Sequence, residues 1–238
     1  MEKTLNQTMK QENPLTELAA KKNREKERKD LEERARAIEE NDSKSTGIVR
    51  FLAVTGILSA AAFVLQYIEI AVPFMPSFIK FDFSDLPALL GSFALGPVSG
   101  IVIELIKNLL HSAVSQSFGI GEISNFILGA VFVAVAGLIY KRKKTRTGAL
   151  IGAFVGAAAM ALISLPANIF LVYPVYYNFM PKEVVLKMYQ AIIPSVQSMN
   201  QALLLFNVPF TFVKGIISVM ITMLIYKPLS PVLHGRRG

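Results

Sequence analysis

Long apolar runs without charge alternate with short polar connections along the chain from residue 48 onward. About 20 apolar residues in a helix cross the roughly 30 Å hydrocarbon core of a bilayer. On that criterion we expect six membrane segments, at residues 48–72, 85–95, 97–114, 122–140, 148–173 and 201–226. The second segment is too short to span alone and is expected to pack inside the bundle or near one face. The pattern therefore predicts an all-α membrane protein, a bundle of six transmembrane helices.

Basic residues are concentrated in connections that would share one side of the membrane. They are KRKKTRT at 141–147, Lys44 with Arg50, and Lys227 with Arg236 and Arg237. Because cytoplasmic connections are enriched in Lys and Arg, we expect a multi-pass protein of the plasma membrane with both termini in the cytoplasm. The connections expected outside are residues 71–84, 115–121 and 177–200.

The first 47 residues differ from the rest because they carry many charges of both signs and no apolar run. Residues 1–50 hold 12 basic and 11 acidic side chains. Pairs such as Glu25 with Lys29 and Glu32 with Arg36 favour a helix, so we expect residues 1–47 to form a cytosolic tail that is helical or partly disordered. The balance of charge argues against a nucleic-acid-binding arm. The membrane domain then covers 48–228, and 229–238 form a short basic cytosolic tail.

Composition excludes several classes of function. Apolar residues make up 53% of the chain and its mean hydropathy is +0.46, as expected of an integral membrane protein. Cysteine is absent, and two isolated histidines do not make a zinc site. No HExxH, GxSxG or Walker A motif occurs, so we expect no enzyme and no ATP site of the usual kind. Energy for transport would come from a gradient or from a partner.

Polar residues inside the apolar segments fall on helical stripes, where each faces a cavity or a partner. Glu104, Lys107, Asn108 and His111 share one face of the third segment, where Glu104 and Lys107 can neutralise each other; interhelical hydrogen bonding is the favoured interpretation of this stripe. In the sixth segment the stripe has no acid on its own helix, so Lys214 is a candidate for a functional site. The other stripe residues are Asn207, Thr211 and Ser218 in the sixth segment, Glu122 and Asn125 in the fourth, and Asn168 after Pro166 in the fifth.

The connection at 71–84 is rich in phenylalanine although it is expected to face water. Its apolar side chains must enter the membrane interface or cover something, which is typical of a lid. Ser84 is a candidate N-cap for the helix that follows, and Asp85 in its first turn suits the positive end of the helix dipole. The phenylalanines are Phe74, Phe78, Phe81 and Phe83.

Small residues at every fourth position allow helices to approach closely. Gly148, Gly152 and Gly156 are interpreted as internal packing of the fifth segment. Gly56 with Ala60 in the first segment could pack internally or present a smooth face to another subunit.

Four motifs in order carry a resemblance to a known family. They are PFMPSFIKFDFSDLPALLG, GPVSGIVIELIKNLLH, GEISNFILG and VPFTFVKG. Together they resemble the riboflavin-binding S components of energy-coupling factor (ECF) vitamin transporters, over about residues 48–228. The resemblance implies a six-helix protein that binds its vitamin in an outward-facing pocket under the loop between helices one and two. It also implies a membrane coupling protein and two cytosolic ATPases as partners, with riboflavin as the transported ligand and no cofactor.

The resemblance also assigns residues. It makes Asn168 and Lys214 the strongest ligand contacts, with Thr211 as a third where relatives can carry Asn. An Asn amide and a Lys ammonium can pair with the carbonyl and N–H groups of the isoalloxazine ring. Gly56 and Ala60 match the patch that S components use against the coupling protein. Further candidates are Phe78, Phe81 and Leu86 as apolar walls, Asn125 for the polar chain of the ligand, and Asp82 at the outer rim of the pocket.

Three alternatives stay open from the sequence. The chain could be a self-sufficient secondary transporter in which Lys214 and Glu104 relay protons. It could be an S component for another vitamin, or for FMN or FAD. It could also be a membrane scaffold without a ligand.

Overall fold

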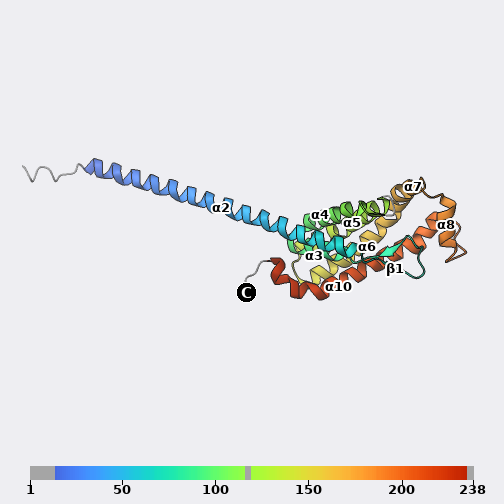
Figure 1. The fold of residues 1–238 in the computed structure, drawn as a ribbon. Helices are drawn as coiled ribbons and strands as arrows, with labels where there is room; N and C mark the ends of the chain where they lie inside the picture. Colours follow the sequence, from blue (N-terminus) through green and yellow to red (C-terminus); the bar gives the residue numbers. More distant parts are fainter. Residues whose placement is uncertain (1–13, 116–118, 235–238) are drawn as a thin grey trace, which may run out of the picture. The chain divides into compact units, whose positions relative to one another are not determined.

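A computed structural model describes residues 14–115 and 119–234 of the chain (Figure 1). Of the basic C-terminal residues, Arg236 and Arg237 lie outside the described residues, as do residues 116–118 of the second outer connection. The chain divides into two compact units, with the boundary between Arg50 and Phe51.

The first unit contains the N-terminal part of one long helix, α2 (Pro14–Gln66). Exposed ion pairs between residues four apart run along it, including Glu25 with Lys29 at 3.1 Å. Glu32 meets Arg28 at 3.6 Å, in place of the expected Arg36. Each such pair contributes a few tenths of a kcal/mol to a helix, about 0.3–0.5 kcal/mol. The described part of the charged tail is helical.

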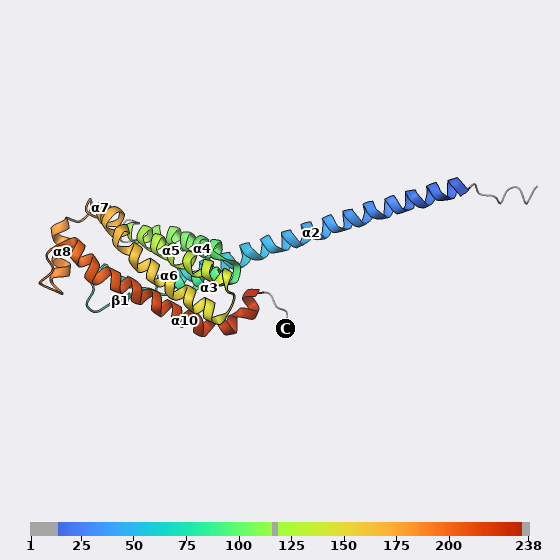
Figure 2. The same ribbon diagram turned by 180° about the vertical axis from the view of Figure 1, so that it is seen from behind.

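The second unit is built almost entirely of helices (Figures 1 and 2). After the end of α2 its elements are β1 (Ile70–Ala71), β2 (Lys80–Phe81), α3 (Asp85–Leu95), α4 (Pro97–Ser112), α5 (Ile120–Arg142), α6 (Arg146–Ala167), η1 (Asn168–Val172), α7 (Tyr173–Tyr176), α8 (Lys182–Gln190), α9 (Met199–Ala202), η2 (Leu203–Asn207) and α10 (Val208–His234). Among the described residues, four helical stretches are long and apolar enough to cross a membrane, at 21–66, 120–142, 146–176 and 199–225. With 11 and 16 residues, α3 and α4 are shorter.

The first membrane segment ends earlier than the sequence pattern predicted, at Gln66 in place of residue 72. The residues beyond it turn away because they pair with the following strand. Ile70 lies opposite Phe81 and Ala71 opposite Lys80 in an antiparallel hairpin. An ion pair between Glu69 and Lys80 joins the two sides. The connection predicted as a loop is thus a short hairpin that leads into α3.

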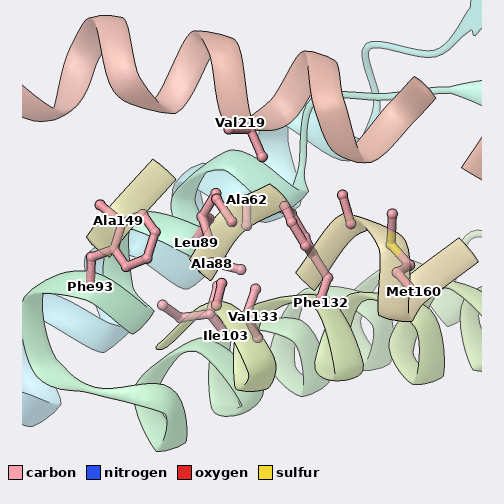
Figure 3. Packing of buried hydrophobic residues seen from close by; sticks show 13 residues of the cluster. Ala62, Ala88, Leu89, Phe93, Ile103, Phe132, Val133, Ala149, Met160 and Val219 are labelled. Atoms are coloured by element: carbon pink, nitrogen blue, oxygen red, sulfur yellow. The ribbon is translucent and has the colours of Figure 1, made fainter. Parts of the chain in front are cut away.

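Alanine and glycine bring α5 and α6 into close contact in the core. A Cβ at Gly152 would lie 2.7 Å from the carbonyl oxygen of Ala136, and one at Gly156 would lie 2.6 Å from that of Phe132. The predicted internal packing of the glycine repeat is therefore confirmed. Figure 3 shows the larger side chains that fill the adjoining space, contributed by α3, α4, α5 and α6, with Val219 of α10 against them.

Two π-helical segments interrupt the long helices, and each ends two residues before a proline. Pro174 follows η1 and Pro209 follows η2. Proline lacks the N–H that would bond four residues back, and its ring collides with that carbonyl. In both helices the carbonyl concerned lies inside the π segment, which gives a local reason for the wider turn. The first residue of η1 is Asn168 and the last residue of η2 is Asn207.

Replacing each of two glycines by alanine tests the packing, because the two changes are expected to have different effects on the free energy of unfolding. Gly129 of α5 faces the buried Glu104 carboxylate, which a Cβ would overlap, whereas Gly56 of α2 is exposed and has no atom within 4 Å of an added Cβ. We expect Gly129→Ala to lower the free energy of unfolding by about 1–3 kcal/mol, the usual cost of overpacking. Gly56→Ala should be neutral or stabilising by up to about 1 kcal/mol, since alanine favours a helix. Thermal unfolding in detergent measures both, and equal shifts for the two variants would contradict the packing described.

Candidate functional site

A cavity of about 560 Å³ opens among the helices of the second unit. Its walls come from the β1–β2 hairpin and the start of α3, from α4, α5 and α6 through α8, and from η2 with α10. Six of the residues predicted to bind a ligand line it: Asn168, Lys214, Thr211, Asn125, Phe78 and Asp82. The helices therefore bring together residues that lie more than 130 positions apart in the sequence.

Two predicted wall residues do not line the cavity. Phe81 and Leu86 are both buried, and the Phe81 ring packs edge-on against Phe83 with ring centroids 5.0 Å apart. Side chains alternate across a strand and rotate around a helix, so neighbours along the hairpin and α3 point in different directions. Phe78, in contrast, lines the cavity, and its ring lies beside those of Tyr176 and Tyr189.

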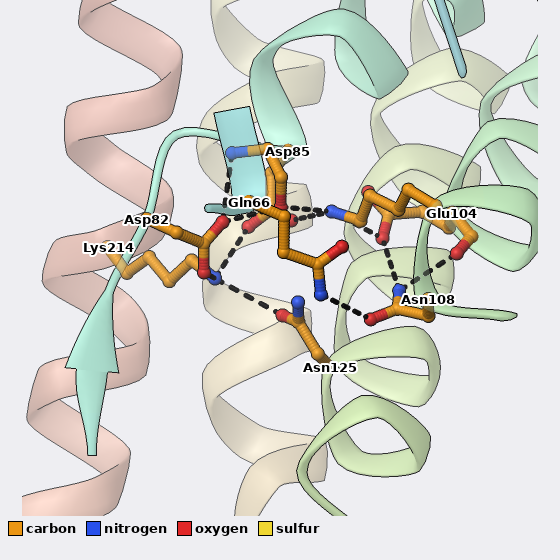
Figure 4. A network of polar contacts seen from close by, with 9 residues as sticks. Gln66, Asp82, Asp85, Glu104, Asn108, Asn125 and Lys214 are labelled. Atoms are coloured by element: carbon orange, nitrogen blue, oxygen red, sulfur yellow. Dashed lines mark hydrogen bonds and ion pairs between the residues drawn. The ribbon is translucent and has the colours of Figure 1, made fainter. Parts of the chain in front are cut away.

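Lys214 has acidic partners, which corrects the expectation from its own helix. Its Nζ lies 2.9 Å from Asp82 Oδ2, 3.3 Å from Asp85 Oδ2 and 3.2 Å from Asn125 Oδ1 (Figure 4). An ammonium has three N–H groups, so each can be directed at one of these oxygens. These partners come from the end of the hairpin, from α3 and from α5. The sequence of α10 alone therefore could not have predicted them.

Ser84 does not cap α3 as predicted, although Asp85 does lie in the first turn of this helix. Ser84 stands at the N-cap position, but its hydroxyl donates to Asp82 and accepts from Lys107 Nζ at 2.7 Å, and it makes no cap hydrogen bond. Asp85 is buried in the first turn, where Lys107 donates to its Oδ1 at 2.6 Å. A carboxylate without water needs such partners more than it needs a helix dipole. Asp82, predicted at the rim, is likewise buried.

The polar stripe of α4 continues this network between the helices (Figure 4). The predicted pair of Glu104 and Lys107 is confirmed at 2.8 Å. Asn108 donates to the Glu104 carbonyl oxygen at 2.8 Å and accepts from Gln66, the last residue of α2, at 3.1 Å. Contacts between helices thus account for this stripe, as favoured from the sequence.

A second polar cluster lies on the wall formed by α4 and α5. His111 Nδ1 is 2.8 Å from Glu122 Oε1, and Ser115 donates to Glu122 Oε2 at 2.8 Å. The Tyr67 ring meets the His111 ring edge-on at 5.2 Å. All four residues line the cavity. The sequence had placed His111 and Glu122 on polar faces without predicting that they meet.

Aromatic residues from distant segments pack around Phe78, which lies between the two strands of the hairpin. The Phe78 ring lies 5.8 Å from that of Tyr176 and 6.0 Å from that of Tyr189. The hydroxyl groups of Tyr173 and Tyr189 form a hydrogen bond with an O–O distance of 2.6 Å. Sequence reasoning did not single out these tyrosines, although the run YPVYY at 173–177 was a visible signal. Phe74, at the hairpin tip, is 82% exposed and adopts a φ of 69°.

Asn168 presents one end of its amide to the cavity. Its Nδ2 donates to the Ser164 carbonyl oxygen at 2.7 Å, which leaves Oδ1 as an acceptor. Thr211 adds a hydroxyl one turn before Lys214. Within the described ranges no group of three or more potential metal ligands occurs. The arrangement is a pocket with apolar walls and a few directed polar groups, which is typical of a small-molecule binding site.

Comparison with known proteins agrees with this description. Residues 50–226 match the family described as "ECF transporter, substrate-specific component". The riboflavin transporter RibU of Staphylococcus aureus (strain TCH60) is 33% identical over 182 residues, which cover 76% of this chain and 91% of that protein. The riboflavin transporter FmnP of Bacillus subtilis (strain 168) is 30% identical over 193 residues, covering 80% and 97%.

A solved structure is similar as well. It is described as "Structure and mechanism of the S component of a bacterial ECF transporter". It shares 32% sequence identity with this chain and superposes with a TM-score of 0.62. The match covers 77% of this chain and 96% of the other.

Proposed function

Because the chain belongs to the family of substrate-specific components of ECF transporters, we propose that it is the riboflavin-binding, substrate-capture subunit of an ATP-driven vitamin importer. The observation that carries this proposal is the cavity, in which six of the residues assigned to the ligand by resemblance lie together. The protein is a transporter component of the membrane and not an enzyme. Riboflavin is its transported substrate.

The chemistry of the cavity suits a flavin. The pyrimidine edge of isoalloxazine alternates carbonyl acceptors with an N–H donor, and Asn168 Oδ1 is available to accept from that N–H. Thr211 can donate to or accept from a neighbouring group. Lys214 can donate to a ligand carbonyl when that oxygen replaces Asn125, a neutral partner, at Nζ. Phe78, Leu128 and Met160 supply apolar walls for the ring faces.

The position of the hairpin supports its assignment as the lid. It connects α2 to α3 and contributes Phe78 and Lys80 to the cavity wall. We assign the six membrane helices of the family to the end of α2, to α3, α4 and α5, to α6 through α7, and to α9 through α10. The basic connection at 141–147 then lies in the cytoplasm together with both termini, and the hairpin lies outside the plasma membrane.

The partners of the proposed importer are a membrane coupling protein and two cytosolic ATPases. Gly56 and Ala60 are exposed on α2, while Thr55 on the buried side bonds Ser99 of α4 at 2.8 Å. The exposure of this small-residue face supports the second reading of the sequence, in which it contacts another subunit. Glu104 and Lys214, the two residues considered for a proton relay, are connected through Lys107 and Asp85. Each link between them is an ion pair that stabilises the bundle.

Binding of riboflavin by the purified full chain is the direct test. We expect quenching of flavin fluorescence on titration, with a dissociation constant between the nanomolar and the low micromolar range. Thiamine and biotin serve as control vitamins and should not raise the melting temperature. Absence of quenching together with an unchanged melting temperature across the vitamins would contradict the proposal. Uptake by vesicles that contain this chain alone would instead indicate a self-sufficient transporter.

A further inference from the structure

Three polar groups form a hydrogen-bonded chain at the outer part of the cavity. The hydroxyls of Tyr173 in α7 and Tyr189 in α8 are 2.6 Å apart, and Tyr189 donates to Asn207 Oδ1 at 2.8 Å. Asn207 is the last residue of η2. These hydrogen bonds thus link the connection between α7 and α9 to the helix that carries Thr211 and Lys214.

The direction of the Tyr173–Tyr189 hydrogen bond follows from that of the bond between Tyr189 and Asn207. A phenol has one proton, and that of Tyr189 goes to Asn207. Tyr173 must therefore donate to the Tyr189 oxygen. Burial raises the pKa of Tyr189 above its ordinary value, so its hydroxyl keeps the proton that it donates. With Asn207 Oδ1 at Tyr189, as the structure has it, Tyr173 and Tyr189 each donate their one proton along the chain, and the Tyr189 hydroxyl holds the amide in this orientation.

The remaining end of the amide belongs to the cavity. Asn207 lines the cavity, whereas Tyr189 is 0% exposed and does not line it. With its Oδ1 at Tyr189, the Asn207 amide has Nδ2 as the end that remains for a ligand. Other polar groups on the wall are more fully engaged, because Lys214 Nζ faces three oxygens and Asn168 Nδ2 already donates to Ser164. Asn207 therefore offers an N–H donor that is oriented before any ligand arrives.

We propose that Tyr189 is a positioning residue for substrate capture, which holds Asn207 so that its Nδ2 donates to an acceptor atom of the bound flavin. This inference rests on the proposed function and adds a specificity element to it. Asn207 is two helical turns from Lys214, about 10 Å along the axis. The two residues therefore address different parts of one ligand. Without the Tyr189 hydroxyl the amide can turn over and present its oxygen to the same acceptor, which is repulsive.

A double-mutant cycle on riboflavin affinity tests the proposal. We expect Tyr189→Phe to raise the dissociation constant by about 3- to 10-fold, the value of one hydrogen bond. In an Asn207→Ala background the same change should have no further effect, because the amide that it orients is gone. Asn207→Asp should bind more weakly than Asn207→Ala, since a carboxylate offers the cavity only acceptors. Tyr177→Phe is the matched control, because Tyr177 is half-buried and does not line the cavity.

The outcomes separate a positioning role from a structural one. Equal losses of affinity from Tyr189→Phe with and without Asn207 would overturn the proposal, and so would a loss matched by Tyr177→Phe. If Tyr189→Phe does not fold, the comparison of Asn207→Asp with Asn207→Ala decides, and tighter binding by the Asp variant overturns the proposal. If the unaltered chain fails to bind riboflavin, the proposed function falls and this inference falls with it. If the unaltered chain binds riboflavin but the effects of Tyr189→Phe and Asn207→Ala add, the proposed function stands and only the positioning role of Tyr189 is wrong.

Discussion

Replacing Lys107 by methionine is expected to lower the free energy of unfolding by about 3–5 kcal/mol, the usual cost of removing one partner of a buried ion pair. Lys107 is 0% exposed, and its Nζ contacts Asp85 at 2.6 Å, Glu104 at 2.8 Å and Ser84 at 2.7 Å. Methionine fills similar volume but leaves two carboxylates inside the bundle without their shared cation. Thermal unfolding of the purified variant in detergent measures the loss.

Lys80→Met is the control for this experiment. Lys80 also pairs with a carboxylate, that of Glu69, but the two side chains are 40% and 35% exposed. An exposed pair contributes about 0–1 kcal/mol, so this variant should unfold close to the unaltered protein. Equal melting temperatures for the Lys107 and Lys80 variants would show that burial does not determine how much these ion pairs contribute to stability.

The sequence predicted the helices of the fold better than the points at which they end. Helix covers most of each predicted membrane range because a long apolar run admits few other structures in a bilayer. The end of the first segment was wrong, since Ile70 and Ala71 are as apolar as the helix before them. Their place in a hairpin depends on pairing with Lys80 and Phe81, which apolar periodicity does not report.

For the candidate site, helical spacing predicted which residues share a face but not which faces meet. Spacing correctly placed Glu104 beside Lys107 within α4. One acidic partner of Lys214 is Asp82, which is 132 residues away, so this ion pair exists only once the hairpin lies against α10. The same limit applies to Asp85. Its position in a first turn suggested a role at the helix end, whereas its partner Lys107 comes from another helix.

Tyr189 was missed for a different reason. It lies in the connection between α7 and α9, where hydropathy indicated an outer loop and no stripe could be drawn. Its importance follows from complete burial and from two hydrogen bonds to other segments. Asn207 was on a recognised stripe, but the orientation of an amide is decided by its neighbours in space.

Lys214→Met is expected to produce the largest loss of riboflavin affinity among single changes in the cavity, by about 100-fold or more. A hydrogen bond from a charged donor is worth about 1.5–3 kcal/mol, and about 2.7 kcal/mol corresponds to 100-fold. Lys214 lines the cavity and is the cation beside Asp82, which otherwise receives hydrogen bonds from Ser84. Without Lys214 the ligand loses a donor and faces a carboxylate. Fluorescence titration measures the affinity, and Lys187→Met, an exposed change outside the cavity, is the control.

A second variant distinguishes the two ways in which Lys214 could act. Lys214→Met combined with Asp82→Asn removes the uncompensated carboxylate together with the ammonium. If Lys214 contacts the ligand, the double variant binds riboflavin as weakly as Lys214→Met. If Lys214 serves only to neutralise Asp82, the double variant regains most of the affinity, and the assignment of Lys214 as a ligand contact is wrong. Since Asp85 keeps Lys107 as a partner in both variants, the rest of the buried network stays paired and the comparison concerns the cavity alone.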